Sequence, residues 1–68
     1  MESETAIVLK IGNRFFYGFG KIGQIKTAWS LAGAKLFGEW REDEIIAVEK
    51  RLKAKGKYCQ REYVVIKL

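Results

Sequence analysis

The sequence predicts a small α+β domain, in which a mostly antiparallel sheet of three or four strands carries one main helix on one face. Two features lead to this prediction. The first half of the chain alternates β-branched and aromatic runs with short glycine turns, a pattern typical of strand hairpins. The second half contains one segment with apolar residues at helical spacing, followed by a last β-rich run. The expected order of elements is therefore ββ(β)αβ.

Three strands are expected before the helix. Residues 5–11 and 14–19 are rich in β-branched and aromatic side chains, and Gly12-Asn13 between them suits a two-residue hairpin turn. A second glycine turn at residues 20–23 leads to a third strand at residues 24–29.

A helix is expected at residues 41–55. Apolar residues at positions i, i+3 and i+7 form a stripe that faces the core. Acidic side chains crowd the first turn and lysines the last, which is the order that the helix dipole favours. Gly56 supplies a left-handed stop, and a closing strand is expected at residues 58–68. The stripe consists of Ile45, Val48 and Leu52, and the charged residues are Glu42, Asp43, Glu44, Lys53 and Lys55.

The connection between the third strand and the helix is expected to be short. Ser30 suits the N-cap of a helical turn at residues 31–36, which Gly33 weakens. The helix then crosses to the last strand. A right-handed crossover would place that strand parallel to the first, in the order 3-2-1-4, with the helix on one face.

The first hairpin is apolar on both faces, which one helix cannot cover. We expect Ile7, Leu9, Ile11 and Phe16 on one face, and Ala6, Val8, Phe15, Tyr17 and Phe19 on the other. Two interpretations remain open. The second face is either an exposed surface for binding or self-association, or the sheet curls and residues 31–40 fold back over it.

Length and composition predict one folded domain, residues 1–68. Nearly half of the residues are hydrophobic, and proline is absent. The first residues are acidic and polar, unlike a secretory signal, and no apolar run reaches the roughly 20 residues that span a bilayer. We therefore expect a cytoplasmic protein with no membrane association.

Catalytic chemistry is not expected. The chain has no histidine, and its single cysteine, Cys59, leaves neither a disulfide nor a zinc cluster. The glycines at positions 18, 20 and 23 match G-x-G-x-x-G, but strand-forming residues follow them where a dinucleotide fold needs a helix. We predict no cofactor, no metal site and no catalytic residue.

Aromatic and basic side chains are the candidate partner-binding residues. The aromatic anchors are Phe15, Tyr17, Phe19 and Trp40. The basic side chains follow one another along the helix and would attract an acidic partner: Lys50, Arg51, Lys53 and Lys55. The structural alternatives are core aromatics and a solvated helix face. Trp29 and Trp40, on either side of the short helical turn, are expected to pack in the core, although an exposed tryptophan would suit an interface.

Residues 27–37 include the pattern Leu31-x-x-Ala34-Lys35-x-Phe37, ahead of an acid-started helix and a closing strand. Over most of its length the chain resembles small phage- and prophage-encoded accessory proteins, which have a strand hairpin, a Leu-x-x-Ala-Lys-x-Phe segment, a helix and a strand. The resemblance implies packing roles for Ala34 and Phe37. It also implies a factor that binds a host protein, as anti-CRISPR inhibitors do.

The expected function is that of a small non-enzymatic protein-binding module, an inhibitor of a bacterial host complex that contacts a host or phage protein. Homodimerisation through the open sheet face belongs to the same hypothesis. The alternative is a sequence-independent nucleic-acid-binding domain that uses the basic helix and the aromatic strand, for which the net charge of +5 is suitable. Binding that weakens steeply with salt would favour the alternative.

Overall fold

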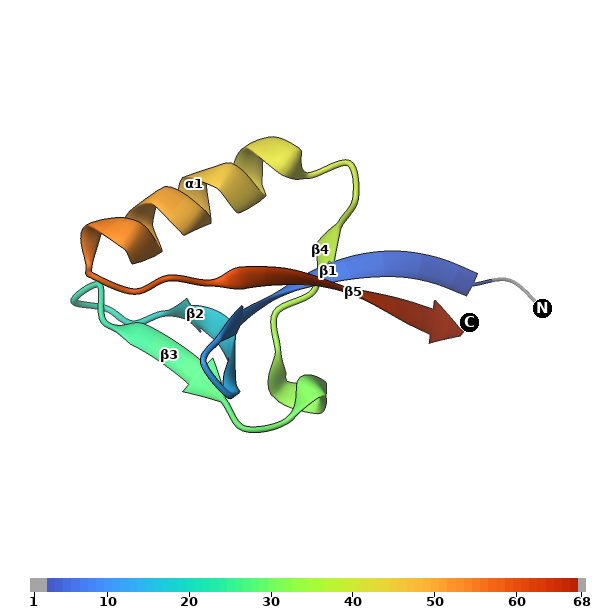
Figure 1. The fold of residues 1–68 in the computed structure, drawn as a ribbon, viewed down its shortest axis with the longest axis horizontal. Helices are drawn as coiled ribbons and strands as arrows, with labels where there is room; N and C mark the ends of the chain where they lie inside the picture. Colours follow the sequence, from blue (N-terminus) through green and yellow to red (C-terminus); the bar gives the residue numbers. More distant parts are fainter. Residues whose placement is uncertain (1–2, 68) are drawn as a thin grey trace.

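The computed structural model describes residues 3–67, and the side chains of residues 4–66 (Figure 1). Five strands and one α-helix confirm the α+β prediction, and residue 68 of the expected last strand lies outside the described part. The elements follow in the order β1 (Ser3–Ile11), β2 (Arg14–Phe19), β3 (Ile25–Ala28), the 3-10 turn η1 (Leu31–Gly33), β4 (Phe37–Gly38), α1 (Glu42–Ala54) and β5 (Gln60–Lys67).

β1 is the central strand of the sheet. On one edge it pairs antiparallel with β5, from Ser3 opposite Lys67 to Lys10 opposite Gln60. On the other edge it pairs with β4 near its middle and with β2 at its end. The two-residue turn between β1 and β2 has φ +62° at Gly12, as expected for a tight hairpin. β3 pairs with the far edge of β2.

The last strand runs antiparallel to the first, and the expected parallel arrangement is therefore wrong. The reason is β4, a strand of two residues that the sequence does not predict. β4 is antiparallel to β1, so the chain has already reversed direction before α1 begins. The helix consequently connects two parallel strands, β4 and β5, that lie on opposite edges of β1.

A β-bulge in β2 changes the direction of Phe19. The register between β2 and β3 shifts after Phe16, which leaves Tyr17 as an extra residue. The alternation of side chains moves by one position, and Phe19 contacts the ring of Phe16 edge-on, with the ring centroids 5.1 Å apart. The prediction that Phe19 shares a face with Phe15 and Tyr17 is wrong for this reason.

α1 closely matches the predicted helix. Its first turn carries three acidic residues, and its last turn carries Arg51 and Lys53, as the helix dipole favours. Gly56 has φ +78° and lies where the helix is expected to stop. No helix among residues 3–67 has the length and apolarity to cross a bilayer.

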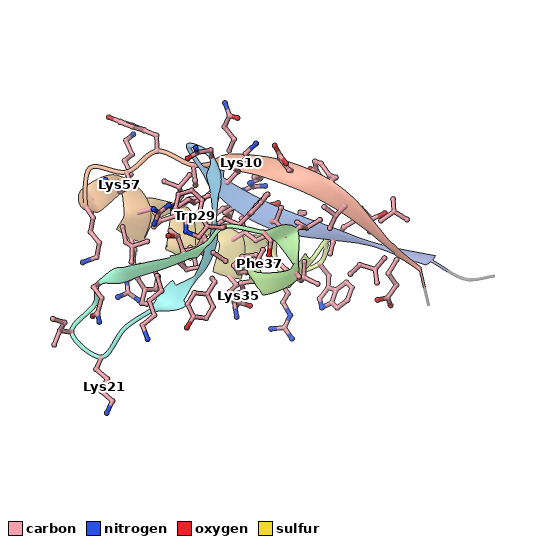
Figure 2. The ribbon with its side chains drawn as sticks, turned by 90° about the horizontal axis from the view of Figure 1, so that it is seen from below. Lys10, Lys21, Trp29, Lys35, Phe37 and Lys57 are labelled. Atoms are coloured by element: carbon pink, nitrogen blue, oxygen red, sulfur yellow. The ribbon has the colours of Figure 1, made fainter. Side chains whose placement is uncertain are left out.

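β1 is covered on both of its faces. α1 lies over one face, and the segment around η1 lies on the opposite side of the β1–β5 pair (Figures 1 and 2). Ala6 and Val8 point away from the helix and are nevertheless only 5% and 0% exposed. The backbone N–H of Lys35 donates to the carbonyl of Phe16, which ties this segment to β2. Of the two interpretations of the second face, the structure favours the curled sheet at β1.

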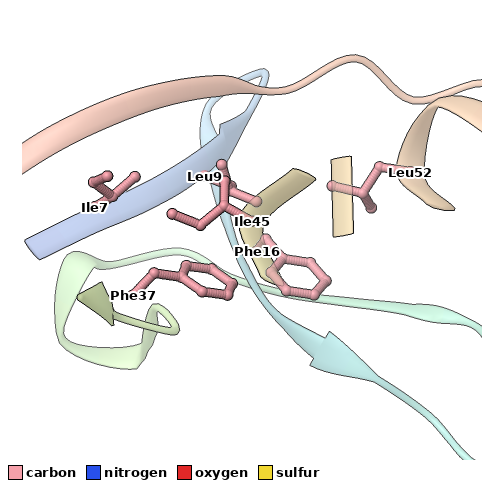
Figure 3. Close-up of a cluster of buried hydrophobic side chains, with 6 residues drawn as sticks. All are labelled: Ile7, Leu9, Phe16, Phe37, Ile45 and Leu52. Atoms are coloured by element: carbon pink, nitrogen blue, oxygen red, sulfur yellow. The ribbon is translucent and has the colours of Figure 1, made fainter. Parts of the chain in front are cut away.

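The core lies between the sheet and the helix. It brings together two residues of β1, one each of β2 and β4, and two of α1, all at most 2% exposed: Ile7, Leu9, Phe16, Phe37, Ile45 and Leu52 (Figure 3). Phe37, which has the packing role that the resemblance implies, pairs directly with Ile7 of β1. The core therefore fixes both the helix and the β2–β3 hairpin relative to β1.

Candidate functional site

Charge is distributed unevenly along the chain. No aspartate or glutamate occurs between residues 10 and 38 or between residues 50 and 61, although both stretches contain several lysines and arginines. The acidic residues of the described part belong to α1, the loop before it, and the β1–β5 pair: Glu4, Glu39, Glu42, Asp43, Glu44, Glu49 and Glu62. The two stretches without acids thus hold most of the positive charge.

The fold brings these basic stretches together at one end of the molecule. The turn between β2 and β3 lies beside the C-terminal end of α1 (Figure 1). The Nζ of Lys55 and an Nη of Arg51 lie 3.6 Å and 4.0 Å from the position that a Cβ would occupy at Gly23 in that turn. We call this region the basic end and define it by the residues Arg14, Arg51, Lys55 and Lys57.

The cations of the basic end are not neutralised by the described acidic residues. The ion pairs among residues 4–66 involve Lys10, Lys35, Arg41 and Arg61, all outside the basic end. Two arginines of the basic end lie over aromatic rings instead. Arg51 is 3.8 Å from the ring centroid of Phe19, and Arg14 is 3.7 Å from that of Trp29. Aromatic contact holds a guanidinium in place without cancelling its charge.

A pocket of about 340 Å³ opens at the basic end. Two apolar residues and four polar or charged residues from β1, β2, β3, the first hairpin turn and the α1–β5 loop line it: Ile11, Asn13, Arg14, Ile25, Thr27 and Lys57. Its volume is at the lower end of the roughly 300–1,000 Å³ typical of small-molecule sites. The lining combines an apolar wall with two cations and contains no acid.

Arg14 is the most constrained cation of this pocket. Its guanidinium stacks on Trp29 and donates from Nη1 to the Oγ1 of Thr27 at 3.5 Å, a long hydrogen bond. Trp29 itself is 68% exposed, so the stacked pair lies at the surface. The remaining N–H groups of Arg14 are available to an anion, because no described carboxylate pairs with this side chain.

Arg61, on β5, shows the opposite arrangement. It donates to both carboxylate oxygens of Glu49, from Nε at 3.0 Å and from Nη2 at 2.8 Å, and from Nη1 to Glu42 at 2.9 Å. The hydrogen bond from Arg61 lowers the pKa of Glu42, and both carboxylates raise the pKa of Arg61. These contacts join α1 to β5. They use all three nitrogens of the Arg61 guanidinium, so few N–H donors are left for an outside anion.

The structure separates the four predicted aromatic anchors. Phe19 packs against the core, and Phe15 is half-buried on the face of β2 away from the helix, near the Nζ of Lys10. Tyr17 is 48% exposed at the bulge, and Trp40 is 76% exposed and lies against Gly38. They do not form one continuous aromatic surface. The expectation that Trp29 and Trp40 pack in the core is wrong, because both indoles are mostly exposed.

The four predicted basic residues, Lys50, Arg51, Lys53 and Lys55, are all exposed on or just after α1. The sequence did not single out Arg14, Trp29 or Lys57 as one site, which the fold assembles from β2, the end of β3 and the α1–β5 loop. The lack of acidic residues between positions 10 and 38 was the signal that could have indicated it.

The thiol of Cys59 is not activated as a nucleophile. Cys59 is half-buried against the core, and burial, followed by the negative charge of Glu49, raises the pKa of its thiol. A raised pKa disfavours the nucleophilic thiolate. Among residues 3–67 no group of three or more Cys, Asp or Glu side chains is placed to hold a metal ion.

No protein-family model, curated protein or solved structure matches this chain.

Proposed function

We propose that this protein is a non-enzymatic module that binds single-stranded nucleic acid, without sequence specificity, through its basic end. The observation that carries the proposal is the Arg14–Trp29 pair, in which a fixed and unneutralised guanidinium lines a pocket together with Lys57. Proteins of this functional class combine a positively charged groove for phosphates with aromatic side chains for bases.

The phosphate contacts would come from both sides of the pocket. Arg14 lies on β2, Lys57 lies on the loop after α1, and Lys55 and Arg51 continue the positive charge toward Gly23. Because the described acidic residues do not pair with these cations, an approaching phosphate does not have to displace a carboxylate. The contacts would release cations condensed on the nucleic acid, which is the main source of affinity in this class of binding.

The base contacts would involve the exposed stacked pair. The indole of Trp29 and the guanidinium plane of Arg14 both offer flat surfaces, and unstacked bases pack on aromatic rings and on arginine planes. A duplex keeps its bases stacked inside, so it would use the phosphate contacts alone. Single strands should therefore bind more tightly than duplexes of the same length.

The test is a fluorescence anisotropy titration with labelled single-stranded and double-stranded oligonucleotides at low and higher salt. We expect the single strand to bind. A plot of log affinity against log salt concentration should have a slope of roughly −0.7 for each neutralised phosphate. Lys57→Gln should weaken binding, whereas Lys35→Gln, which removes the same charge from a lysine paired with Glu44, should not. Absence of binding at low salt, or equal losses in the two variants, would sink the proposal.

A second candidate, a protein-binding module that inhibits a host complex, is supported by Trp40 and Tyr17. Trp40 is 76% exposed, and large aromatic residues at the surface are frequent interface anchors. The resemblance to phage accessory proteins points the same way. Under this candidate, a bacterial protein captured by the wild type should be lost with Trp40→Ala, and oligonucleotides should not bind. The separation of the four aromatic anchors makes this the weaker candidate.

A further inference from the structure

The outer edge of β5 is the longest strand edge that residues 3–67 leave without a partner. β5 has eight residues, and each pairs with β1 in an uninterrupted register, so β5 contains no bulge. In Figures 1 and 2 no described segment of the chain runs along that edge. Backbone N–H and C=O groups therefore project from it toward solvent.

The middle of this edge lacks the features that usually prevent strand pairing, and its charged residues, Arg61, Glu62 and Lys67, lie toward its two ends. Charged residues, prolines, bulges and short length protect natural sheet edges. The opposite edge of the sheet, β3, has only four residues and includes the exposed Lys26. The middle of β5, by contrast, is Tyr-Val-Val-Ile at residues 63–66, where Tyr63 is 64% and Val65 is 67% exposed. The edge of β5 is thus longer than that of β3, and it has an uncharged, partly exposed apolar stretch at its middle.

We propose that β5 pairs antiparallel with β5 of a second copy of this chain, which joins the two sheets at their edges. A two-fold axis perpendicular to an antiparallel sheet passes through the midpoint between a residue and its own copy. With that residue Val64, Tyr63 lies opposite Val65 of the second copy, and Val65 lies opposite its Tyr63. Aromatic and β-branched cross-strand pairs are stabilising, and symmetry forms this pair twice.

The neighbouring registers are less favourable. An axis at Tyr63 would place Val65 opposite Arg61 of the second copy, and an axis at Val65 would place Tyr63 opposite Lys67. Each of these puts an exposed apolar residue against a charged one. The register centred on Val64 places Glu62 opposite Ile66, which is half-buried. It also places Arg61 opposite Lys67, where the charge of Arg61 is already compensated by Glu42 and Glu49.

This dimer differs from the one expected through an open sheet face. Ala6 and Val8 on the second face of β1 are already covered, whereas the edge of β5 is not. The edge is also separate from the Arg14–Trp29 pair, so the inference does not depend on the proposed function. A monomer that binds nucleic acid would contradict the dimer alone, and a dimer that does not bind nucleic acid would contradict the proposed function alone.

The test is sedimentation velocity of the full chain over a range of protein concentrations, with variants that probe the register. Wild type should form a dimer, and Val65→Lys should raise its dissociation constant roughly tenfold or more, since two pairs are lost at once. The double variant Tyr63→Lys with Val65→Glu should restore the dimer, because this register alone places each lysine opposite a glutamate. Tyr58→Lys, at a 78% exposed tyrosine before β5, is the matched control and should dimerise as wild type does.

Three results would overturn the proposal: a monomeric wild type at its highest soluble concentration, an unchanged dimer in Val65→Lys, or a double variant that stays monomeric while folded. A wild type that stays monomeric and instead pairs its β5 edge with a strand of another protein would also count as the first result. Thermal melts monitored by circular dichroism would confirm that the variants fold. If Val65→Lys does not fold, Tyr63→Lys, at the other half of the same pair, takes its place.

Discussion

Arg61 and Arg14 are both fixed by their neighbours, but the neighbours have opposite consequences. Arg61 donates to Glu49 and Glu42, so its charge is compensated and the contacts connect β5 to α1. Arg14 stacks on Trp29 and donates to Thr27, so its position is restricted while its charge remains. One arginine holds two elements of the fold together, and the other presents its charge to solvent.

The difference shows why total charge says little about where a small basic protein binds. The net charge of +5 includes cations that acidic neighbours already compensate, such as Arg41 and Lys35 beside Glu44. The cations that can attract an anion are those of the basic end, to which the fold contributes two separate acid-free stretches of the chain. A held but uncompensated guanidinium also loses less conformational entropy when an anion binds.

Replacing Arg14 should have the largest effect on binding. Arg14→Gln should weaken the single-stranded oligonucleotide complex by roughly tenfold or more, because hydrogen bonds to charged groups contribute about 1.5–3 kcal/mol. Anisotropy titration at low salt measures the change. The melting temperature should hardly change, because no described carboxylate loses an ion-pair partner when Arg14 is replaced. The matched control is Arg41→Gln, an arginine that pairs with Glu44 at 3.0 Å. Equal losses of affinity in the two variants would mean that net charge, and not the Arg14 site, controls binding.

Replacing Arg61 should reverse the pattern. Arg61→Ala leaves Glu49 and Glu42 without their hydrogen-bond donor, and we expect the free energy of unfolding to fall by about 1–2 kcal/mol, the lower part of the range for charged hydrogen bonds because the groups are partly exposed. Urea denaturation measures the loss, and oligonucleotide affinity should not decrease. Arg41→Ala, which breaks an exposed ion pair, should cost only about 0–1 kcal/mol. A loss no larger than this control would contradict the bridging role of Arg61.

Local patterns in the sequence predicted the elements but not their connections. The hairpin, the helix and its stop at Gly56 follow from turn residues and apolar spacing, which are properties of neighbouring residues. β4 did not follow, because two residues show no periodicity, and its pairing depends on Ile7, far away in the sequence. That one short strand reverses the chain and decides that β5 is antiparallel to β1. The bulge at Tyr17 likewise depends on the register with β3 and changes the face of Phe19.

The candidate site was predictable only in part. The basic residues of the helix could be recognised because they are consecutive in the sequence. Arg14 and Trp29 could not be paired in advance, since their contact arises from the antiparallel register of β2 and β3 just beyond Phe15 opposite Ala28. A tryptophan beside a short apolar segment is usually packed, and only the tertiary structure places Trp29 at the surface.

Removing the ring that holds Arg14 should have a smaller effect than removing Arg14 itself. Trp29→Ala should lower the affinity for single strands by roughly fivefold, about 1 kcal/mol, as one stacking contact and the support of Arg14 are lost. The affinity for duplexes should change less, because their bases are not available for stacking. Trp40→Ala, at the other exposed tryptophan, should leave both affinities unchanged. A larger loss for the duplex than for the single strand would contradict the stacking role.

The smallest effect that we expect is a pH dependence of stability that arises from the contact of Arg61 with Glu42. The hydrogen bond from Arg61 lowers the pKa of Glu42 in the folded protein. A carboxyl with a lowered folded pKa stabilises the fold above its unfolded value of about 4.3 and loses that contribution as pH falls through the folded pKa. Wild type should therefore be more stable than Glu42→Gln near neutral pH, and thermal melts should show the difference shrinking below pH about 4.3.

In an Arg61→Ala background the same substitution should give almost no pH-dependent difference, because the guanidinium that lowers the pKa of Glu42 is gone. A difference that persists unchanged in that background would mean that another group sets the pKa of Glu42, and the contrast between the two arginines would then rest on geometry alone.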